Sequence, residues 1–251
     1  MTIFVTEKTV NGILRALYYS FTEKIIPDDV TDGSNYQPEL GARFIKITAD
    51  GKADETNAAR VADALVKYGG ASVLTSIKVC LLSCKSNVML LAFNFAYKTL
   101  SARKNVRKNL SDPVVSEFVF TERKVLAERH LMTGFLRFKE SENGVIYARY
   151  SPDNDVTQLL APHFLQRFSG LPFIIHDVKR GVIAVSDGFR LKFDRTDLDA
   201  NFRESENETE FEKLWKKYYK EVNVKERKNE KQQRGYMPLR YRKFMPETYK
   251  D

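Results

Sequence analysis

The chain of 251 residues has three histidines, and all of them lie between positions 130 and 176. His163 stands four residues before Arg167, which places both side chains on one face of a helix. His176 and Asp177 are neighbours in an apolar segment typical of a strand, so they point to opposite faces. An imidazole beside a carboxylate or a guanidinium can act as a base or bind phosphate.

An enzyme that acts on nucleic acid is therefore one hypothesis. An aspartate near a histidine would activate water for glycosidic or phosphodiester cleavage, in a pocket where the predicted sheet meets a helix. The structural alternative is that His176, which alternates with Ile174 and Val178, packs in the sheet with a hydrogen bond. The candidate catalytic residues are Glu128, His163, His176 and Asp177.

A metal site is not expected, because the chain has neither an HExxH motif nor a paired HxH spacing. Cys80 and Cys84 are the only cysteines, whereas a radical-SAM cluster needs three thiolates. On a helix both would share an apolar face with Ile77 and Leu81. We predict that they pack in the core, with no cofactor, cluster or disulfide framework.

The last 36 residues, 216–251, carry almost all of the net charge. They contain twelve Lys or Arg and five Asp or Glu, a sum of +7 in a chain whose total is +8. Cations that alternate with aromatic faces suit a phosphate backbone with exposed bases. We predict that this tail contacts nucleic acid, with Tyr236 or Tyr241 stacking on a base. The predicted phosphate contacts of the tail are Lys225, Arg227, Lys228, Arg234, Arg240 and Arg242, and those of the middle region are Arg137, Arg167 and Arg180.

The basic segments also allow other interpretations. The tail could instead dock on an acidic protein, which would make the chain an interaction adapter. A second basic stretch at 98–108 fits either a solvated helix end or another phosphate-contacting patch. If the tail binds DNA, the affinity should fall steeply with salt, and deletion of the residues after Val224 should remove most of it.

The first half of the chain has the periodicity of helices. Apolar residues at three- and four-residue steps predict helices at 10–25, 54–68, 72–84 and 86–100. Asp112 followed by Pro113 is a good start for another, running to about residue 129. Residues 43–48 are predicted to form a short strand.

After Leu131 the period changes to that of strands. An antiparallel set is predicted at 134–139, 145–150, 173–178, 182–186 and 189–193, and Asp187-Gly188 is a strong hairpin signal. One helix at 155–168 crosses between the two groups of strands, and Pro162 should kink or split it. A closing helix at 209–220 would have a buried stripe formed by Phe211, Leu214, Trp215 and Tyr218.

The predicted fold class is α+β. A helical N-terminal part, 1–130, precedes a part at 131–251 with an antiparallel β-rich middle, one crossing helix, a C-terminal helix and an ordered basic tail; we expect both parts in one compact unit. The apolar fraction of 43% is that of a globular protein. Its longest apolar stretch is too short to span a bilayer, and the start lacks a signal-peptide pattern. We predict a cytoplasmic protein without membrane contact.

Many of the polar residues above belong to one pattern. Its parts are Glu128-Arg-His130, Gly134-Phe-Leu-Arg137, Pro152-Asp153, His163-Phe164-x-x-Arg167, His176-Asp177-x-x-Arg180, Arg227-Lys-Asn229, Gln232-Gln233, Met237-Pro238, Arg240-Tyr241 and Glu247. In this pattern the chain resembles a family of bacterial proteins described as probable DNA-metabolism proteins, a domain of unknown function. The likeness extends to Gly12-Ile-Leu and Ala59-Arg60-Val61. It departs at Leu131, where a basic residue is expected, and at Arg242, where an aromatic residue is more usual.

The resemblance implies an association with DNA and with a radical-SAM partner. Proteins of that family accompany a radical-SAM protein linked to DNA modification or repair, and a similar domain occurs fused to a uracil-DNA-glycosylase-like domain. The family offers no established catalytic residues to carry over. The leading hypothesis is thus an accessory protein for DNA metabolism or repair, which binds nucleic acid and presents it to the partner enzyme.

Overall fold

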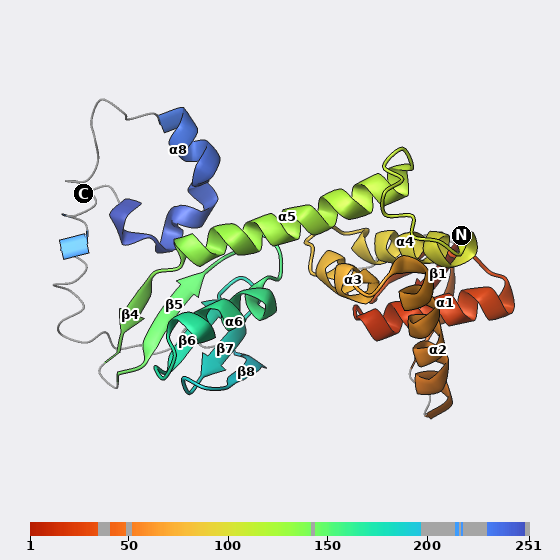
Figure 1. Cartoon of the computed structure of the whole chain (residues 1–251), viewed down its shortest axis with the longest axis horizontal. Helices are drawn as coiled ribbons and strands as arrows, with labels where there is room; N and C mark the ends of the chain where they lie inside the picture. Colours follow the sequence, from red (N-terminus) through yellow and green to blue (C-terminus); the bar gives the residue numbers. More distant parts are fainter. Residues whose placement is uncertain are drawn as a thin grey trace. The chain divides into compact units, whose positions relative to one another are not determined.

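The computed structural model describes residues 1–34, 41–48, 52–141, 144–196, 214–215, 217 and 230–248. Two compact units are present, Met1–Leu126 and Ala127–Asp251. The fold is α+β, as predicted, with a helical N-terminal half (Figure 1).

A small parallel sheet lies in the N-terminal unit. It consists of β1 (Thr2–Val5), β2 (Asp29–Thr31) and β3 (Arg43–Lys46), in the order β2-β1-β3. The strand predicted at 43–48 is confirmed as β3, and the sequence analysis missed the other two. Both pairings of β1 are parallel, so the carboxyl ends of all three strands meet at one edge of the sheet.

Five helices account for most of the rest of this half. They are α1 (Val10–Glu23), α2 (Lys52–Gly69), α3 (Val73–Leu81), α4 (Val88–Ala102) and α5 (Pro113–Phe135). The predicted start of α5 is confirmed, because the Asp112 carboxylate accepts hydrogen bonds from the backbone of Val114 (2.9 Å) and Val115 (3.3 Å). The helix continues to Phe135, beyond its predicted end, and it contains the boundary between the units.

The core of the N-terminal unit forms around Phe4 of β1, which is fully buried. Its ring meets Tyr19 of α1 edge-on at 5.4 Å and Phe93 of α4 at 6.2 Å between centroids. Phe95 of α4 stacks on Phe118 of α5 at 3.8 Å. The central strand is thereby fixed by helices that follow it at very different distances in the sequence.

The two cysteines have different environments. Cys80, in α3, is fully buried, as predicted. Cys84 is exposed, and its predicted place in the core is wrong because α3 ends at Leu81, three residues earlier. Burial raises the pKa of the Cys80 thiol to about 12, and the carboxylate of Glu122 adds to the shift.

A thiol reagent should therefore distinguish the two cysteines. At about pH 8 we expect one thiol, that of Cys84, to react in the native protein, because the raised pKa keeps Cys80 protonated and burial excludes the reagent. Unfolding in denaturant should release the second thiol. Ellman's reagent measures both stages, and a Cys84→Ser variant that still reacts rapidly when native would contradict this assignment.

A mixed five-stranded sheet organises the C-terminal unit. Its strands, in spatial order, are β4 (Phe138–Glu140), β5 (Ile146–Tyr150), β6 (Phe173–Asp177), β7 (Val182–Ser186) and β8 (Leu191–Arg195). All neighbours pair antiparallel except β5 and β6. The prediction of a wholly antiparallel set is wrong, because the helix between β5 and β6 returns the chain to the edge where β5 began.

The crossing helix α6 (Thr157–Arg167) lies on one face of this sheet (Figure 1). Pro162 does not split it, contrary to one of the two predicted outcomes. Phe164 of α6 packs at 4.9 Å from the ring of Phe138, and Phe168 packs at 6.0 Å from that of Phe173. These aromatic contacts form the core between helix and sheet.

The β7–β8 connection confirms the predicted hairpin. The Asp187 carboxylate accepts hydrogen bonds from the backbone of Phe189 (2.9 Å) and Arg190 (2.8 Å). Gly188 has a φ of +95°, which favours glycine. The backbone of Gly170 also lies so close that a Cβ at position 188 would collide with it.

Within the tail, the structure describes secondary structure between residues 230 and 248. These residues form α8 (Glu230–Tyr236) and two short 3-10 helices, η2 (Leu239–Phe244) and η3 (Pro246–Thr248). Most of the helix predicted at 209–220 lies outside the described residues. Leu214 and Trp215, predicted to be buried there, are 61% and 39% exposed.

Candidate nucleic-acid interface

Glu128, near the C-terminal end of α5, is a buried carboxylate that joins two distant segments. One segment follows β5: the carboxylate accepts hydrogen bonds from the backbone of Asp153 (2.7 Å) and Asn154 (2.8 Å), and from the Asn154 amide (2.6 Å). The other is the tail, whose Tyr241 hydroxyl donates at 2.6 Å. Four donors therefore compensate the desolvation of one negative charge.

Tyr241 is the buried anchor of the tail. It is 7% exposed, and burial together with the Glu128 carboxylate raises the pKa of its hydroxyl, which stays protonated and donates. Arg240 donates to Asp153 at 2.7 Å and lies 4.5 Å above the Tyr241 ring, while its own side chain stays 58% exposed. Tyr241 cannot stack on a base from this position.

A second contact fixes the end of the tail. Glu247, whose side chain is 1% exposed, accepts from Arg137 Nε at 2.9 Å and from Trp215 Nε1 at 3.1 Å. Arg137 also donates to the backbone carbonyl of Gly134 at 2.6 Å. Its guanidinium lies 5.6 Å from the Trp215 ring. Arg137 is thus committed to holding η3 rather than displayed for a phosphate.

The Asp177–Arg180 pair holds the turn after β5, which contains Pro152 and Asp153. Asp177 is fully buried and accepts from Arg180 at 2.8 Å, and burial raises the pKa of its carboxyl. Arg180 also donates to the carbonyl oxygens of Pro152 (3.1 Å) and Asp153. The motif therefore clamps the turn after β5, the same turn that Glu128 caps.

The three histidines lie in different surroundings. His176 is buried, and its Nδ1 lies 2.7 Å from the Tyr147 hydroxyl, in agreement with the predicted packed histidine. His163 and Arg167 are both exposed on α6, and His130 is exposed on α5. The candidate catalytic residues are thus divided between buried structural bonds and open surface.

The exposed side of the ordered tail is basic. Arg242 is half-buried and donates to the carbonyl of Met237 within the tail at 3.1 Å. Phe244 lies between two cations, with Arg149 of β5 at 5.5 Å and Lys243 at 5.4 Å from its ring. Tyr236 is 72% exposed, so it offers the stacking face that Tyr241 does not. The exposed cations of residues 230–248 are Lys231, Arg234, Arg240 and Lys243.

The residues predicted to contact nucleic acid include both side chains that hold the tail, such as Arg137, and exposed cations, such as Arg234. Lys225, Arg227 and Lys228 lie outside the described residues. Asn154 was missed altogether; its position after Pro152-Asp153 could have suggested a turn, but not the carboxylate that it meets. Asp153 and Glu247 were recognised as parts of the pattern and not as the partners of Arg240 and Arg137.

The structure defines an α+β protein with a mixed sheet, whose basic tail is held by two buried carboxylates, Glu128 of α5 and Glu247 of the tail itself. Residues 86–247 match the model of a family described as a domain of unknown function, DUF4130. This is more than half of the chain, which therefore belongs to that family. Gly12 and Ala59-Arg60-Val61 precede the matched range. Searches of curated proteins and of solved structures gave no match.

Among the described residues, no single helix is long and apolar enough to cross a membrane. Only together do residues 55–69 and 73–81 have that length and apolar character, and they are bent by 109°. In the same residues, no group of three or more His, Cys, Asp or Glu side chains is arranged to hold a metal ion.

Proposed function

We propose that the protein binds nucleic acid through the exposed side of its ordered tail, as an accessory protein in DNA metabolism or repair. The observation that carries the proposal is the pair of buried contacts that hold the tail: Tyr241 donates to Glu128 of α5, and Glu247 accepts from Arg137. The backbone that carries the exposed Arg240 and Lys243 is then held in place, so less entropy is lost when this segment meets a phosphate backbone. Tyr236 adds an exposed ring for stacking.

Substituting three exposed cations should test this directly. In Lys231→Gln/Arg234→Gln/Lys243→Gln we expect the affinity for DNA at about 0.1 M salt to fall by roughly 100-fold. The reason is that fewer counterions are released from the DNA on binding when fewer phosphates are contacted. The slope of log affinity against log salt should become shallower by roughly 2–3. Fluorescence anisotropy with a labelled single strand and the matching duplex, over a range of salt, gives both quantities.

The matched control carries the same change of charge elsewhere in the unit. Lys179→Gln/Lys192→Gln/Arg195→Gln removes three exposed cations of the β6–β8 region and should leave affinity nearly unchanged. Equal losses in the two variants would mean that only net charge matters, and the proposal would be wrong. Tyr236→Leu in the same assay separates stacking from charge, because it should weaken single-strand binding more than duplex binding.

A radical-SAM enzyme is the proposed partner, on the family resemblance alone. Co-purification of the two proteins, with and without nuclease, would test it. A complex that survives nuclease treatment while the protein alone binds no DNA would instead support the adapter function.

A further inference from the structure

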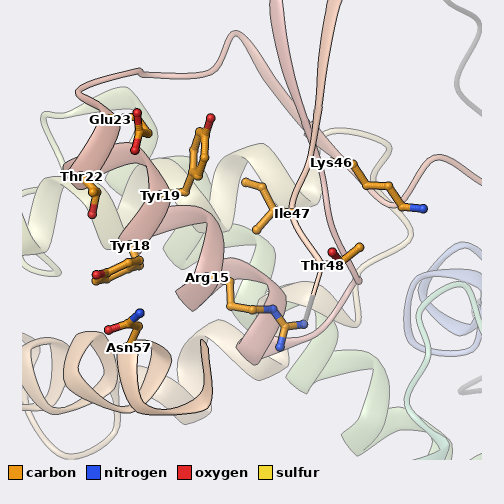
Figure 2. A pocket seen from close by; sticks show the side chains of 9 residues that line it. All are labelled: Arg15, Tyr18, Tyr19, Thr22, Glu23, Lys46, Ile47, Thr48 and Asn57. Atoms are coloured by element: carbon orange, nitrogen blue, oxygen red, sulfur yellow. The ribbon is translucent and has the colours of Figure 1, made fainter. Parts of the chain in front are cut away.

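A separate cavity lies in the N-terminal unit, within residues that the nucleic-acid proposal does not use. Its volume is about 260 Å³, and α1, α2 and the residues at the end of β3 line it (Figure 2). Polar and aromatic side chains face it, among them Arg15, Tyr18, Tyr19, Thr48 and Asn57. Pockets of this kind, with a few polar groups on aromatic walls, are where small molecules bind.

The cavity is at the place where this sheet topology favours ligands. The strand order β2-β1-β3 reverses at β1, since the chain goes from β1 to one side and then crosses to the other. In open parallel sheets, ligands bind outside the carboxyl ends of the strands at such a switch point. Ile47 and Thr48 directly follow β3, and Arg15 reaches Glu7, which follows β1, so the cavity lies at that edge.

Arg15 supplies a charge that is incompletely paired. Its side chain is 10% exposed, and Nη2 donates to one oxygen of Glu7 at 2.7 Å. Its buried Nε has no hydrogen-bond partner among the described residues. Glu7 is 60% exposed, so water screens its charge more than that of the guanidinium. A guanidinium that lines a cavity, with a single exposed carboxylate as its partner, is suited to a carboxylate or a phosphate.

The opposite end of the cavity differs in character. In Figure 2, Thr22 and Glu23 lie at the end away from Arg15, and the Tyr18 ring lies beside the Asn57 amide. Tyr19 is held by its edge-on contact with Phe4, so its position is fixed before a ligand arrives. The anionic end of a ligand would therefore lie at Arg15, and its flat part would extend along α1 toward the tyrosines.

We propose that this cavity binds a small anion that carries one aromatic ring. The anion pairs with Arg15, and the ring contacts Tyr18 and Tyr19. A carboxylate and a phosphate share this chemistry, and the experiment separates them. The proposal does not depend on the binding of nucleic acid by the tail.

Four small probes dissect the two recognition elements in the full chain. Benzoate and phenyl phosphate carry ring and anion, benzamide carries the ring alone, and inorganic phosphate carries the anion alone. We expect saturable binding of benzoate or phenyl phosphate with a Kd on the order of 1 mM, and binding at least about tenfold weaker for the other two. Ligand-detected NMR titration measures each.

Two substitutions should weaken the preferred probe about tenfold or more: Arg15→Met, which removes the charge, and Tyr18→Leu, which removes a ring. Because Tyr18 is half-buried, Tyr18→Leu should leave the fold intact, and it still tests the proposal if Arg15→Met unfolds the protein. Arg43→Gln is the matched control, an exposed cation of β3 outside the cavity. The proposal is overturned if neither ring-bearing anion binds, if benzamide or phosphate binds as tightly, or if the folded variants bind unchanged.

Discussion

Glu128→Ala is expected to lower the free energy of unfolding of the C-terminal unit by about 3–5 kcal/mol. The substitution removes the acceptor of four hydrogen bonds and leaves the donors of Asp153, Asn154 and Tyr241 buried without it. The tail should detach as a consequence. Urea denaturation measures the loss, and the fluorescence of Trp215, the only tryptophan, reports on the tail through its contact with Glu247.

The conservative variant sharpens this prediction. In Glu128→Gln one oxygen becomes an NH₂ group, which would face donors instead of accepting from them, so the cost should still be about 2–3 kcal/mol. His130→Ala, at an exposed position two residues along the same helix, should cost less than about 0.5 kcal/mol. A Glu128→Gln variant as stable as the parent would show that the carboxylate is not the anchor of the tail.

Gly12→Ala should destabilise the N-terminal unit by about 3 kcal/mol or more. A Cβ at this position would lie far inside van der Waals contact with the carbonyl oxygen of Glu7, and backbone atoms have little room to yield. Gly12 also donates to the side chain of Thr9 at 3.0 Å, the cap of α1. The start of the helix and the loop after β1 would be displaced together, which circular dichroism during thermal unfolding can measure.

Gly134→Ala, near the C-terminal end of α5, is the matched comparison, because this helical glycine has open space around it. No atom lies within 4 Å of a Cβ built there, so the change should raise stability by about 0.5–1 kcal/mol through the lost flexibility of the unfolded chain. If both substitutions had the same sign, steric exclusion at Gly12 would not be the reason for glycine there.

The helices were predictable because local signals determine them. The stripe from Val10 onward indicated α1, and the Asp112 cap indicated the start of α5. The strands β1 and β2 were missed although β3, which has as many residues as β1, was predicted. Segments of three or four residues show too little period for a reliable assignment. The direction of β6 was also beyond the sequence pattern, since strand pairing is a tertiary property that alternation does not encode.

The residues of the candidate interface were recognised from the sequence, but not their roles. Arg240 and Tyr241 are adjacent and of the types that bind nucleic acid, yet one side chain is exposed and the other is buried on Glu128. Whether a residue is buried depends on contacts across more than a hundred positions, and residue type alone does not reveal it. The same holds for Arg137, which Glu247 neutralises.

The distance along the chain between the partners of the two buried tail contacts has a consequence for biosynthesis. Glu128 and Tyr241 are 113 residues apart, and Arg137 and Glu247 are 110 apart. During translation the sheet and α6 are synthesised before either tail partner. The carboxylate of Glu128 is therefore without the Tyr241 hydroxyl, and more solvated, until residue 241 has been added. Closing these long loops is then a late step, and a nascent chain that stops before Tyr241 would keep this site hydrated and the unit open to proteases.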